Sequence, residues 1–579
     1  MFIDGKLLIA KGTEPVYLLP GLANRHGLIT GATGTGKTVT MKTIAQSMSD
    51  AGIPVFLADV KGDVSGVAVA GEATEKLVDR LAALGVYDYD FHGCPTRFWD
   101  VYGEGGVPCR TTILEMGPVL LSRLLGLSEV QEGVMNIVFH VADDEGLLLL
   151  DLKDLRTMVN YVGEHAKDYT LSYGQISTQS IGAIQRALLQ LEDAGGNIFF
   201  GEPALDIIDW LATDADGKGY INVLHCVRLV QSPLMYSTFL LWMLSELYEM
   251  LPEVGDLDKP KVCFFFDEAH MLFNEAPRAL LDKVEQIVKL VRSKGVGVYF
   301  VTQNPSDIPN PVLAQLSNKV QHALRAYTPA EQKAIKAAAE SFRVNPDFDT
   351  AEAITELGTG EALISFLQED GTPMVVQRCK VIAPTCSMDA APDDAKDYII
   401  SNDALRSRYG RTYDRDSAYE ILNASFLAAQ RAAEAARIAE EDARLQAELD
   451  AAAEKQRLAE EKEAERRRIA EEKEAERQRI AEEKAAERQR IAEEKEAERQ
   501  RIAAEKEAER QVRLAQQQAE REAREAAKKA EAEEKARLKQ EEADRKAKTK
   551  LIDAALTSAA RAAGSGVGRG LLGTLKKLL

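Results

Sequence analysis

Cysteine is scarce in this 579-residue chain, and its six cysteines follow no recognisable pattern. No two of them have the C-x-x-C spacing, and none combines with histidine in the spacing of a zinc site. We therefore expect reduced thiols, as is usual in the cytoplasm, rather than a disulfide framework or a structural metal. The six are Cys94, Cys109, Cys226, Cys263, Cys379 and Cys386.

Long apolar segments are also missing. The four leucines at 147–150 fall far short of the roughly 20 apolar residues that cross a bilayer. The first residues lack the basic stretch followed by an apolar stretch that marks an export signal. The sequence therefore predicts no transmembrane segment, no export and a cytoplasmic location.

A net positive charge is the third feature that the chain lacks. The net charge is −20 at pH 7, and the two signs nearly balance between residues 431 and 550. The acidic excess therefore lies in the rest of the chain. It repels a polyanion such as DNA unless basic residues gather in one place, for example in a pore. This composition argues against non-specific binding of nucleic acid.

The chain does contain a complete phosphate-binding loop at residues 31–38, which fit the pattern G-x-x-x-x-G-K-[ST]. An apolar run at 27–30 predicts a buried strand before it, and the spacing of apolar residues over 39–48 predicts a helix after it. Backbone N–H groups and the helix N-terminus would bind the phosphates of ATP, Lys37 would reach the terminal phosphates, and Thr38 would bind Mg²⁺. The expected nucleotide-binding residues are Gly31, Ala32, Thr33, Gly34, Thr35, Gly36, Lys37 and Thr38.

Two carboxylates follow a second apolar run, at 262–266, which predicts a central strand. We expect Asp267 to hold Mg²⁺ through water, and Glu268 to orient and deprotonate the attacking water. Hydrolysis needs this division of labour, whereas phosphate transfer to a bound alcohol does not. The pattern therefore predicts a P-loop ATPase and counts against a small-molecule kinase.

Other polar residues follow strands that we expect beside these two. Gln303 follows the apolar run 298–301, where it can hydrogen-bond the terminal phosphate or the water. Residues 59–63 follow the run 55–58 and either face the same site or form a polar loop that caps the next element. Arg292 and Arg325 either contact nucleotide, in this or a neighbouring subunit, or are surface charges.

The tail has a different composition from the rest. From about 425 it consists mainly of Ala, Glu, Lys, Arg and Gln, without Gly or Pro before Gly564, which predicts a long helix. Isoleucine recurs every eleven residues from Ile469 to Ile502, but the apolar seam is narrow and charge pairs at i,i+3 are dense. A solvated single helix is favoured over a weak coiled coil, and both stay open. Either would serve as a spacer or an oligomer handle.

These patterns predict an α/β fold with a mostly parallel sheet, a helical insertion and a long charged helical tail. No N-terminal barrel is expected, because the first residues leave no room for one. The expected divisions are a short strand region at 1–25, the ATPase domain at 26–385 with its insertion at about 75–235, a linker at 386–424, the helical tail at 425–560, and a Gly-rich, amphipathic end at 561–579.

Several motifs follow one another along the chain. They are the phosphate loop with His26–Thr30 before it, and residues 59–63, 266–270, 292–295, 302–305 and 357–362. In this order they resemble the HerA–FtsK group of ring-forming P-loop ATPases and, more narrowly, HerA-like bacterial proteins of the YjgR type. The resemblance implies a RecA-like sheet, a homo-oligomer, expected to be a hexamer with ATP at its subunit interfaces, and translocation or unwinding of double-stranded DNA.

The catalytic residues expected from the patterns above are Lys37, Glu268, Gln303, Arg292 and Arg325.

Two functions therefore stay open. The first is a DNA translocase driven by Mg²⁺-dependent ATP hydrolysis. The second is a nucleotide-controlled scaffold whose helical tail binds protein partners without movement on DNA. The acidic composition and the lack of a recognisable DNA-reading module motivate the second.

Overall fold

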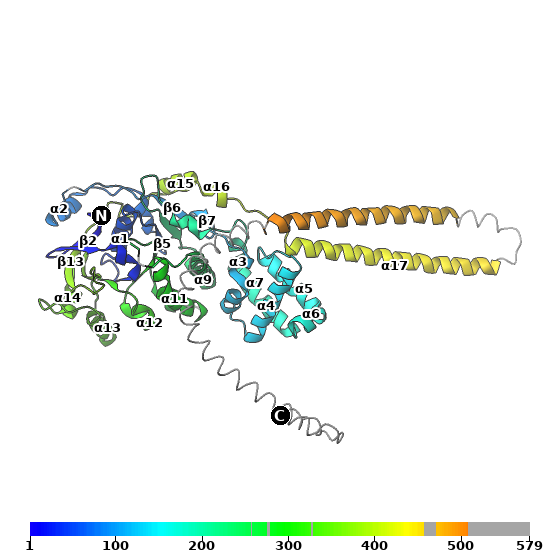
Figure 1. The fold of residues 1–579 in the computed structure, drawn as a ribbon, viewed down its shortest axis with the longest axis horizontal. Coiled ribbons are helices and arrows are strands. Elements are labelled where there is room, and N and C mark those ends of the chain that lie inside the picture. The colour runs from blue at the N-terminus through cyan, green and yellow to red at the C-terminus, as the bar shows by residue number, and fades with distance from the viewer. Residues whose placement is uncertain are drawn as a thin grey trace, which may run out of the picture. The chain divides into compact units, whose positions relative to one another are not determined.

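The computed structural model describes residues 1–505, except 88, 256, 275–277, 326–327 and 457–470, together with residue 507. The chain divides into two units, Met1–Ala504 and Glu505–Leu579. Almost all of the second unit, including the predicted end at 561–579, lies outside the described residues. The first unit contains the sheet, the helices that cover it and the helical region beside it (Figure 1).

A 13-stranded sheet forms the centre, in the order β1-β2-β13-β12-β11-β4-β10-β9-β5-β8-β6-β7, with β3 paired to β2. From β11 to β7 all neighbouring strands are parallel, and from β11 back to β1 they are antiparallel. The predicted α/β fold with a mostly parallel sheet is confirmed. The parallel strands are β11 (Asn318–Gln321), β4 (Gly27–Thr30), β10 (Val296–Thr302), β9 (Val262–Phe266), β5 (Val55–Asp59), β8 (Ile221–His225), β6 (Thr96–Asp100) and β7 (Val107–Pro108). The remaining strands are β1 (Phe2–Ile3), β2 (Lys6–Lys11), β3 (Pro15–Leu18), β12 (Glu361–Ser365) and β13 (Gln377–Val381).

The central strands are apolar on both faces because both faces are buried. Phe264 and Phe266 of β9 join one hydrophobic core, whereas Cys263 and Phe265 between them join another. Successive side chains of a strand point to opposite faces, so a strand covered on both sides reads as a continuous apolar run. Helix α1 (Lys37–Asp50) contributes to the second core, and α9 (Pro233–Met250) and α11 (Arg278–Leu290) contribute to the first.

The predicted insertion at 75–235 is narrower than expected. Three strands of this range, β6, β7 and β8, belong to the sheet, and Trp99 of β6 donates its indole N–H to Asn222 of β8 at 3.0 Å. Phe98 and Trp99 face opposite cores, so β6 lacks the alternation that identifies a half-buried strand. The part without strands, the helical region, consists of α3 (Ile113–Leu124), α4 (Glu129–Asp144), α5 (Leu152–Glu164), α6 (Ala166–Tyr173), α7 (Thr178–Asp193) and α8 (Gly196–Phe199).

Shorter helical elements connect these parts. They are η1 (Pro20–Arg25), η2 (Val64–Ala68), α2 (Glu75–Ala83), η3 (Ile207–Leu211), η4 (Leu229–Gln231), α10 (His270–Asn274), η5 (Val291–Lys294), η6 (Pro305–Asp307), α12 (Asn310–Leu313), α13 (Pro329–Glu340) and α14 (Thr350–Glu356).

Residues 386–424, which we expected to be a linker, are instead packed against the rest of the unit. They form α15 (Asp393–Asn402), α16 (Arg406–Tyr409) and the start of α17 (Ala418–Gln456). Tyr409 is fully buried; its carbonyl accepts from Arg110 at 2.8 Å, and its hydroxyl donates to Asp209 at 2.5 Å. These partners lie far away in the sequence, so the local sequence does not reveal how strongly this one tyrosine anchors the segment.

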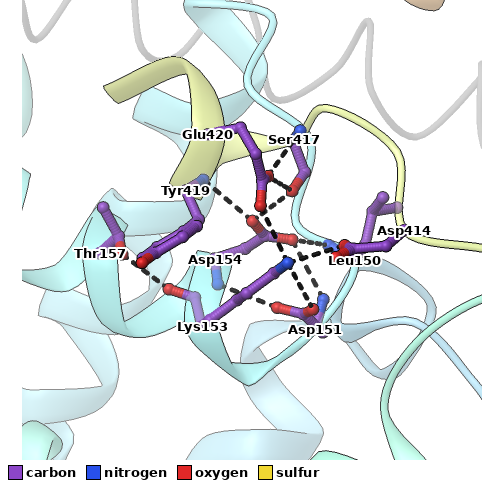
Figure 2. A network of polar contacts seen from close by, with 9 residues as sticks. All are labelled: Leu150, Asp151, Lys153, Asp154, Thr157, Asp414, Ser417, Tyr419 and Glu420. Atoms are coloured by element: carbon purple, nitrogen blue, oxygen red, sulfur yellow. Dashed lines mark hydrogen bonds and ion pairs between the residues drawn. The ribbon is translucent and has the colours of Figure 1, made fainter. Parts of the chain in front are cut away.

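The beginning of α17 is fixed to α5 by a network of polar contacts (Figure 2). The buried carboxylate of Asp154 accepts hydrogen bonds from Ser417 Oγ at 2.6 Å and from the Tyr419 N–H at 3.0 Å. Beside it, Lys153 Nζ pairs with Asp414 at 2.7 Å and with Glu420 at 2.9 Å. The tail helix therefore starts from a defined place on the helical region.

The described tail is helical, over α17 and over residues 471–505, as the composition predicts. The isoleucine at 480 is exposed, and the side chains described around it are exposed as well. The choice between a single helix and a coiled coil stays a prediction.

All six cysteines are buried and free. Burial raises the pKa of each thiol, which keeps the sulfur protonated and unreactive. Among the described residues, no helix combines the length and the apolar character that a membrane crossing requires.

Replacing Asp154 should loosen the base of the tail helix. Asp154→Ala leaves the N–H groups of Leu150 and Tyr419 without an acceptor, and we expect a loss of about 2–4 kcal/mol in the free energy of unfolding. Urea denaturation measures this loss, and hydrogen exchange should accelerate over the first turns of α17. Glu164→Ala, at an exposed position on the same helix α5, is the control. Equal stability of the two variants would contradict the anchoring role.

Candidate nucleotide-binding and catalytic site

Most of the predicted site residues, but not the two arginines, lie at the carboxyl edge of the parallel strands. The register pairs Thr302 of β10 with Thr30 of β4, Phe300 of β10 with Phe266 of β9, and Ala58 of β5 with Phe266. The strands therefore end within about two residues of one another, and the residues that follow them emerge at the same edge. This edge holds the phosphate loop, Gln303, the Asp267–Glu268 pair and residues 59–63.

Three glycines of the phosphate loop have positive φ, at 151° for Gly31, 76° for Gly34 and 112° for Gly36. Gly31 also faces a close neighbour, because a Cβ there would lie 2.5 Å from the Cβ of His322. Gly36 caps α1 without a side-chain hydrogen bond, so the first turn of α1 presents its N–H groups in the way that binds anions. The loop is therefore shaped for phosphate.

Lys37 and Thr38 stand in the first turn of α1. Lys37 is buried, and its Nζ donates to the carbonyl of Ala32 at 3.1 Å. Burial lowers the pKa of Lys37, and the negative charge of Glu268 partly opposes this effect. A buried cation at the mouth of this loop matches the charge of a triphosphate. Thr38 is half-buried next to it.

His322 packs against Gly31 of the phosphate loop, a role that the sequence did not predict. Its Nδ1 lies 2.8 Å from the carbonyl of Glu361 and its Nε2 lies 2.8 Å from Thr40 Oγ1. Burial lowers the pKa of His322 to about 4, so the ring is neutral, with its proton on Nδ1 and Nε2 accepting from Thr40. The available signal was position alone, since His322 directly follows β11, the neighbour of β4.

Residues 357–362 also hold the loop. The N–H of Gly360 donates to the carbonyl of Thr35 at 3.0 Å, and Arg80 donates to the carbonyl of Gly360 at 2.7 Å. Gly360 has φ +76°, and a Cβ there would meet Arg80 at 2.8 Å. The motif that precedes β12 thus fixes the phosphate loop from the antiparallel side of the sheet.

Asp267 is buried at the end of β9 and fits a cation. Its Oδ2 has no hydrogen-bond partner, and burial together with the charge of Glu268 raises its pKa to about 7. An unpaired buried carboxylate is costly, and a divalent cation with its water ligands would satisfy it. The residues at this edge therefore fit Mg²⁺ bound with a nucleotide.

Glu268 is held in an unusual backbone conformation, with φ 47°. Its Oε1 accepts from Lys61 Nζ, and its Oε2 lies 3.1 Å from His270 Nδ1 and 3.5 Å from Gln303 Nε2. Burial on its own would raise the pKa of Glu268, but the hydrogen bond and the charge of Lys61 outweigh it and hold the pKa below its usual value. Glu268 therefore stays ionised, as a base must be.

The two readings of residues 59–63 each apply to part of the segment. Asp59 caps the turn itself, because its carboxylate accepts from the N–H of Gly62 at 2.7 Å and of Val64 at 3.3 Å. Lys61 reaches the site through Glu268. Asp63 Oδ1 is buried and has no hydrogen-bond partner. The sequence did not predict the ion pair between Lys61 and Glu268.

The two arginines lie in different places. Arg292 belongs to η5 before β10, whereas Gln303 follows that strand, so about 20 Å of strand separates Arg292 from the carboxyl edge. Arg325 is exposed beyond β11 and donates to the carbonyl of Thr355 at 3.2 Å. The structure does not bring Arg292 to the site of its own chain. Contact of either arginine with nucleotide on a neighbouring subunit stays a prediction.

The comparison with protein families decides the relationship. The model of the helicase HerA-like C-terminal family matches residues 6–499. The chain belongs to this family. The match confirms the predicted resemblance to the HerA–FtsK group, and the expected enzyme class, a helicase-like P-loop ATPase, agrees with it.

Two curated relatives show how far the similarity extends. The DNA double-strand break repair helicase HerA of Sulfolobus acidocaldarius is 22% identical over 386 residues, which is 62% of this chain and 66% of the relative. HerA of Saccharolobus solfataricus is 23% identical over 378 residues, again 62% of this chain and 66% of the relative. The HerA-like chain thus spans just under two thirds of the length of these relatives.

Two solved structures are similar to the chain over about two thirds of its length. The plasmid coupling protein TrwB in complex with a non-hydrolysable ATP analogue is 14% identical, with a TM-score of 0.46, covering 68% of this chain and 92% of that chain. VirB4 of Thermoanaerobacter pseudethanolicus is 14% identical, with a TM-score of 0.42, covering 68% of this chain and 100% of that chain.

Asp267 should make the stability of the nucleotide-free protein depend on pH. Its pKa is about 7 in the folded protein against an ordinary value of 3.8, so the folded protein keeps a proton that the unfolded chain has lost between these values. The free energy of unfolding therefore falls as the pH rises through this window. Asp267→Asn removes this ionisation. In EDTA it should stabilise the protein by about 1–4 kcal/mol at pH 8 and by much less at pH 5.

Urea denaturation of Asp267→Asn at the two pH values measures this difference. Asp258→Asn, at an exposed position, is the control. An equal effect of Asp267→Asn at both pH values would show that its carboxylate does not titrate in this window.

Proposed function

We propose that this HerA-like protein is a Mg²⁺-dependent ATPase that assembles as a ring, expected to be a hexamer, and couples ATP hydrolysis to translocation or unwinding of double-stranded DNA in the cytoplasm. The observation that carries the proposal is the meeting of a phosphate loop with an ionised, buried glutamate at one edge of the sheet. The glutamate follows an aspartate whose buried oxygen has no protein partner.

The residues divide the work of hydrolysis among them. When bound, Mg²⁺ would neutralise phosphate charge, and Thr38 and Asp267 are the residues that would hold it. Lys37 stabilises charge on the terminal phosphoryl group. Glu268 orients a water and takes its proton as the water oxygen bonds to the terminal phosphorus and the bond to ADP breaks. Gln303, whose amide lies near Glu268, contacts the same water or phosphate.

The substrate and the assembly rest on the family. The curated relatives are named as DNA double-strand break repair helicases, which supports DNA as the polymer. A role for Arg292 at a nucleotide would need such a ring, because the residue lies far from the site of its own chain. A ring would also be compatible with DNA binding despite the net charge of −20, because basic residues need to line only the pore.

The second candidate function is a nucleotide-controlled scaffold that binds protein partners through its tail. The anchoring of α17 on α5 favours it, because a rigid base makes a long helix suitable as a platform. In this case ATP binding would control assembly, and DNA would not alter turnover.

Replacing Glu268 should separate binding from turnover. Glu268→Gln keeps the size and the hydrogen-bonding ability of the side chain but cannot take a proton, so we expect ATP turnover to fall at least about 100-fold while ATP still binds. Release of phosphate and titration with a fluorescent ATP analogue measure the two quantities. Glu285→Gln on α11 is the matched control, and Lys37→Ala is the blank. Undiminished turnover in Glu268→Gln would remove this mechanism.

DNA should stimulate the ATPase in a salt-dependent way. Linear double-stranded DNA is expected to raise steady-state turnover, and the apparent affinity for DNA should fall steeply as salt rises, because phosphate contacts release counterions. Turnover at low and moderate salt, with and without DNA, measures both effects. Hydrolysis that is indifferent to DNA would favour the scaffold.

A further inference from the structure

The two side chains of the ion pair between Lys61 and Glu268 differ strongly in exposure. The Lys61 side chain is 46% exposed, whereas that of Glu268 is 6% exposed. Lys61 stands in the turn after β5 that Asp59 fixes through the N–H groups of Gly62 and Val64. The backbone of Lys61 is therefore held in place while its long side chain is free to take more than one direction.

Both oxygens of Glu268 are engaged in this arrangement. Oε1 accepts from Lys61, and Oε2 faces His270 at 3.1 Å and Gln303 at 3.5 Å. A carboxylate that takes a proton from water needs one oxygen available to that water. Each carboxylate oxygen can accept two hydrogen bonds, but the ion pair with Lys61 makes Oε1 a weaker base. Proton transfer from water to Glu268 is therefore favoured when Lys61 leaves Oε1, since Glu268 itself is buried and its backbone is constrained at φ 47°.

A bound ATP would offer Lys61 a second partner. The positive charge of Lys61 contributes to lowering the pKa of Lys37, the lysine of the phosphate loop, and opposes the rise in the pKa of Asp267. Four charged groups, two of each sign, thus share one edge of the sheet. The terminal phosphate of ATP carries more negative charge than Glu268 and would lie among them, so it competes for the ammonium group of Lys61.

We propose that Lys61 is a positioning residue that alternates between two partners, the carboxylate of Glu268 and the terminal phosphate of ATP. Glu268 becomes available to water only when the terminal phosphate draws Lys61 away. This inference rests on the proposed ATP hydrolysis and adds a reason why the base acts only on a bound triphosphate. ADP lacks the group that would release Glu268, so the pair re-forms after hydrolysis.

The first test measures nucleotide affinity in variants that cannot hydrolyse ATP. In the Glu268→Gln background, Lys61→Met should weaken ATP binding about fivefold to tenfold and leave ADP binding unchanged, because only ATP offers the terminal phosphate. Fluorescence titration with labelled ATP and ADP gives the ratio of the two dissociation constants. An unchanged ratio would overturn the alternation between partners.

The second test needs no nucleotide. Lys61→Met leaves a buried carboxylate without its cation and should lower the midpoint of thermal unfolding, whereas the same change in the Glu268→Gln background should have little effect. Additive effects of the two changes would overturn the ion pair. Lys289→Met with Glu285→Gln is the matched control, because that pair on α11 has a lysine of similar exposure, at 44%, and an exposed glutamate.

The third test is kinetic. Lys61→Met frees Glu268 but also removes a cation from the terminal phosphate, so we expect kcat to fall at least about tenfold. Lys61→Arg should restore part of it, since arginine can also pair with phosphate and carboxylate. Lys289→Met should leave kcat unchanged. A wild-type kcat in Lys61→Met would overturn the inference but leave the proposed ATPase standing. An inactive wild-type protein would instead overturn the proposed function, and the affinity ratio would still decide on Lys61.

Discussion

The whole site depends on the parallel register of neighbouring strands. Because β4, β10, β9 and β5 run in the same direction and end within about two residues of one another, chain segments more than 200 residues apart deliver their polar residues to one edge. The two buried faces of these strands require apolar side chains, which leaves the edge as the place for charge. A slip of one strand by a residue would turn its core residues to the wrong face, so the same constraint that builds the core also aligns the catalytic groups.

Charge at this edge is arranged so that each group depends on its neighbours. Lys37 and Asp267 are buried with their ionised forms disfavoured, whereas Lys61 keeps Glu268 ionised. A nucleotide with its cation would bring charges of both signs and relieve the first two. The free-energy cost of burying these charged groups is relieved when the ligand binds and therefore adds to its affinity. Such strained groups are common at functional sites.

Much of the site could be predicted from the sequence because its motifs are local. The phosphate loop and the pair at Asp267 and Glu268 are each contiguous, and both follow apolar runs that identify buried strands. His322 and Lys61 could not be assigned in the same way, because their roles come from contacts with residues more than 200 positions away. The fold shows a similar limit: β6 is buried on both faces, and one buried tyrosine at 409 anchors its segment through partners 299 and 200 positions away.

The buried carboxylate of Asp154 has a mechanical consequence. Its hydrogen bonds hold the first turn of α17 against α5, so the tail helix is fixed at one end. The helix from Ala418 to Gln456 extends about 58 Å at 1.5 Å per residue, so a tilt of about 5° at its root would displace its far end by about 5 Å. A small tilt of the helical region would therefore move the far end of α17 by about the length of one helical turn.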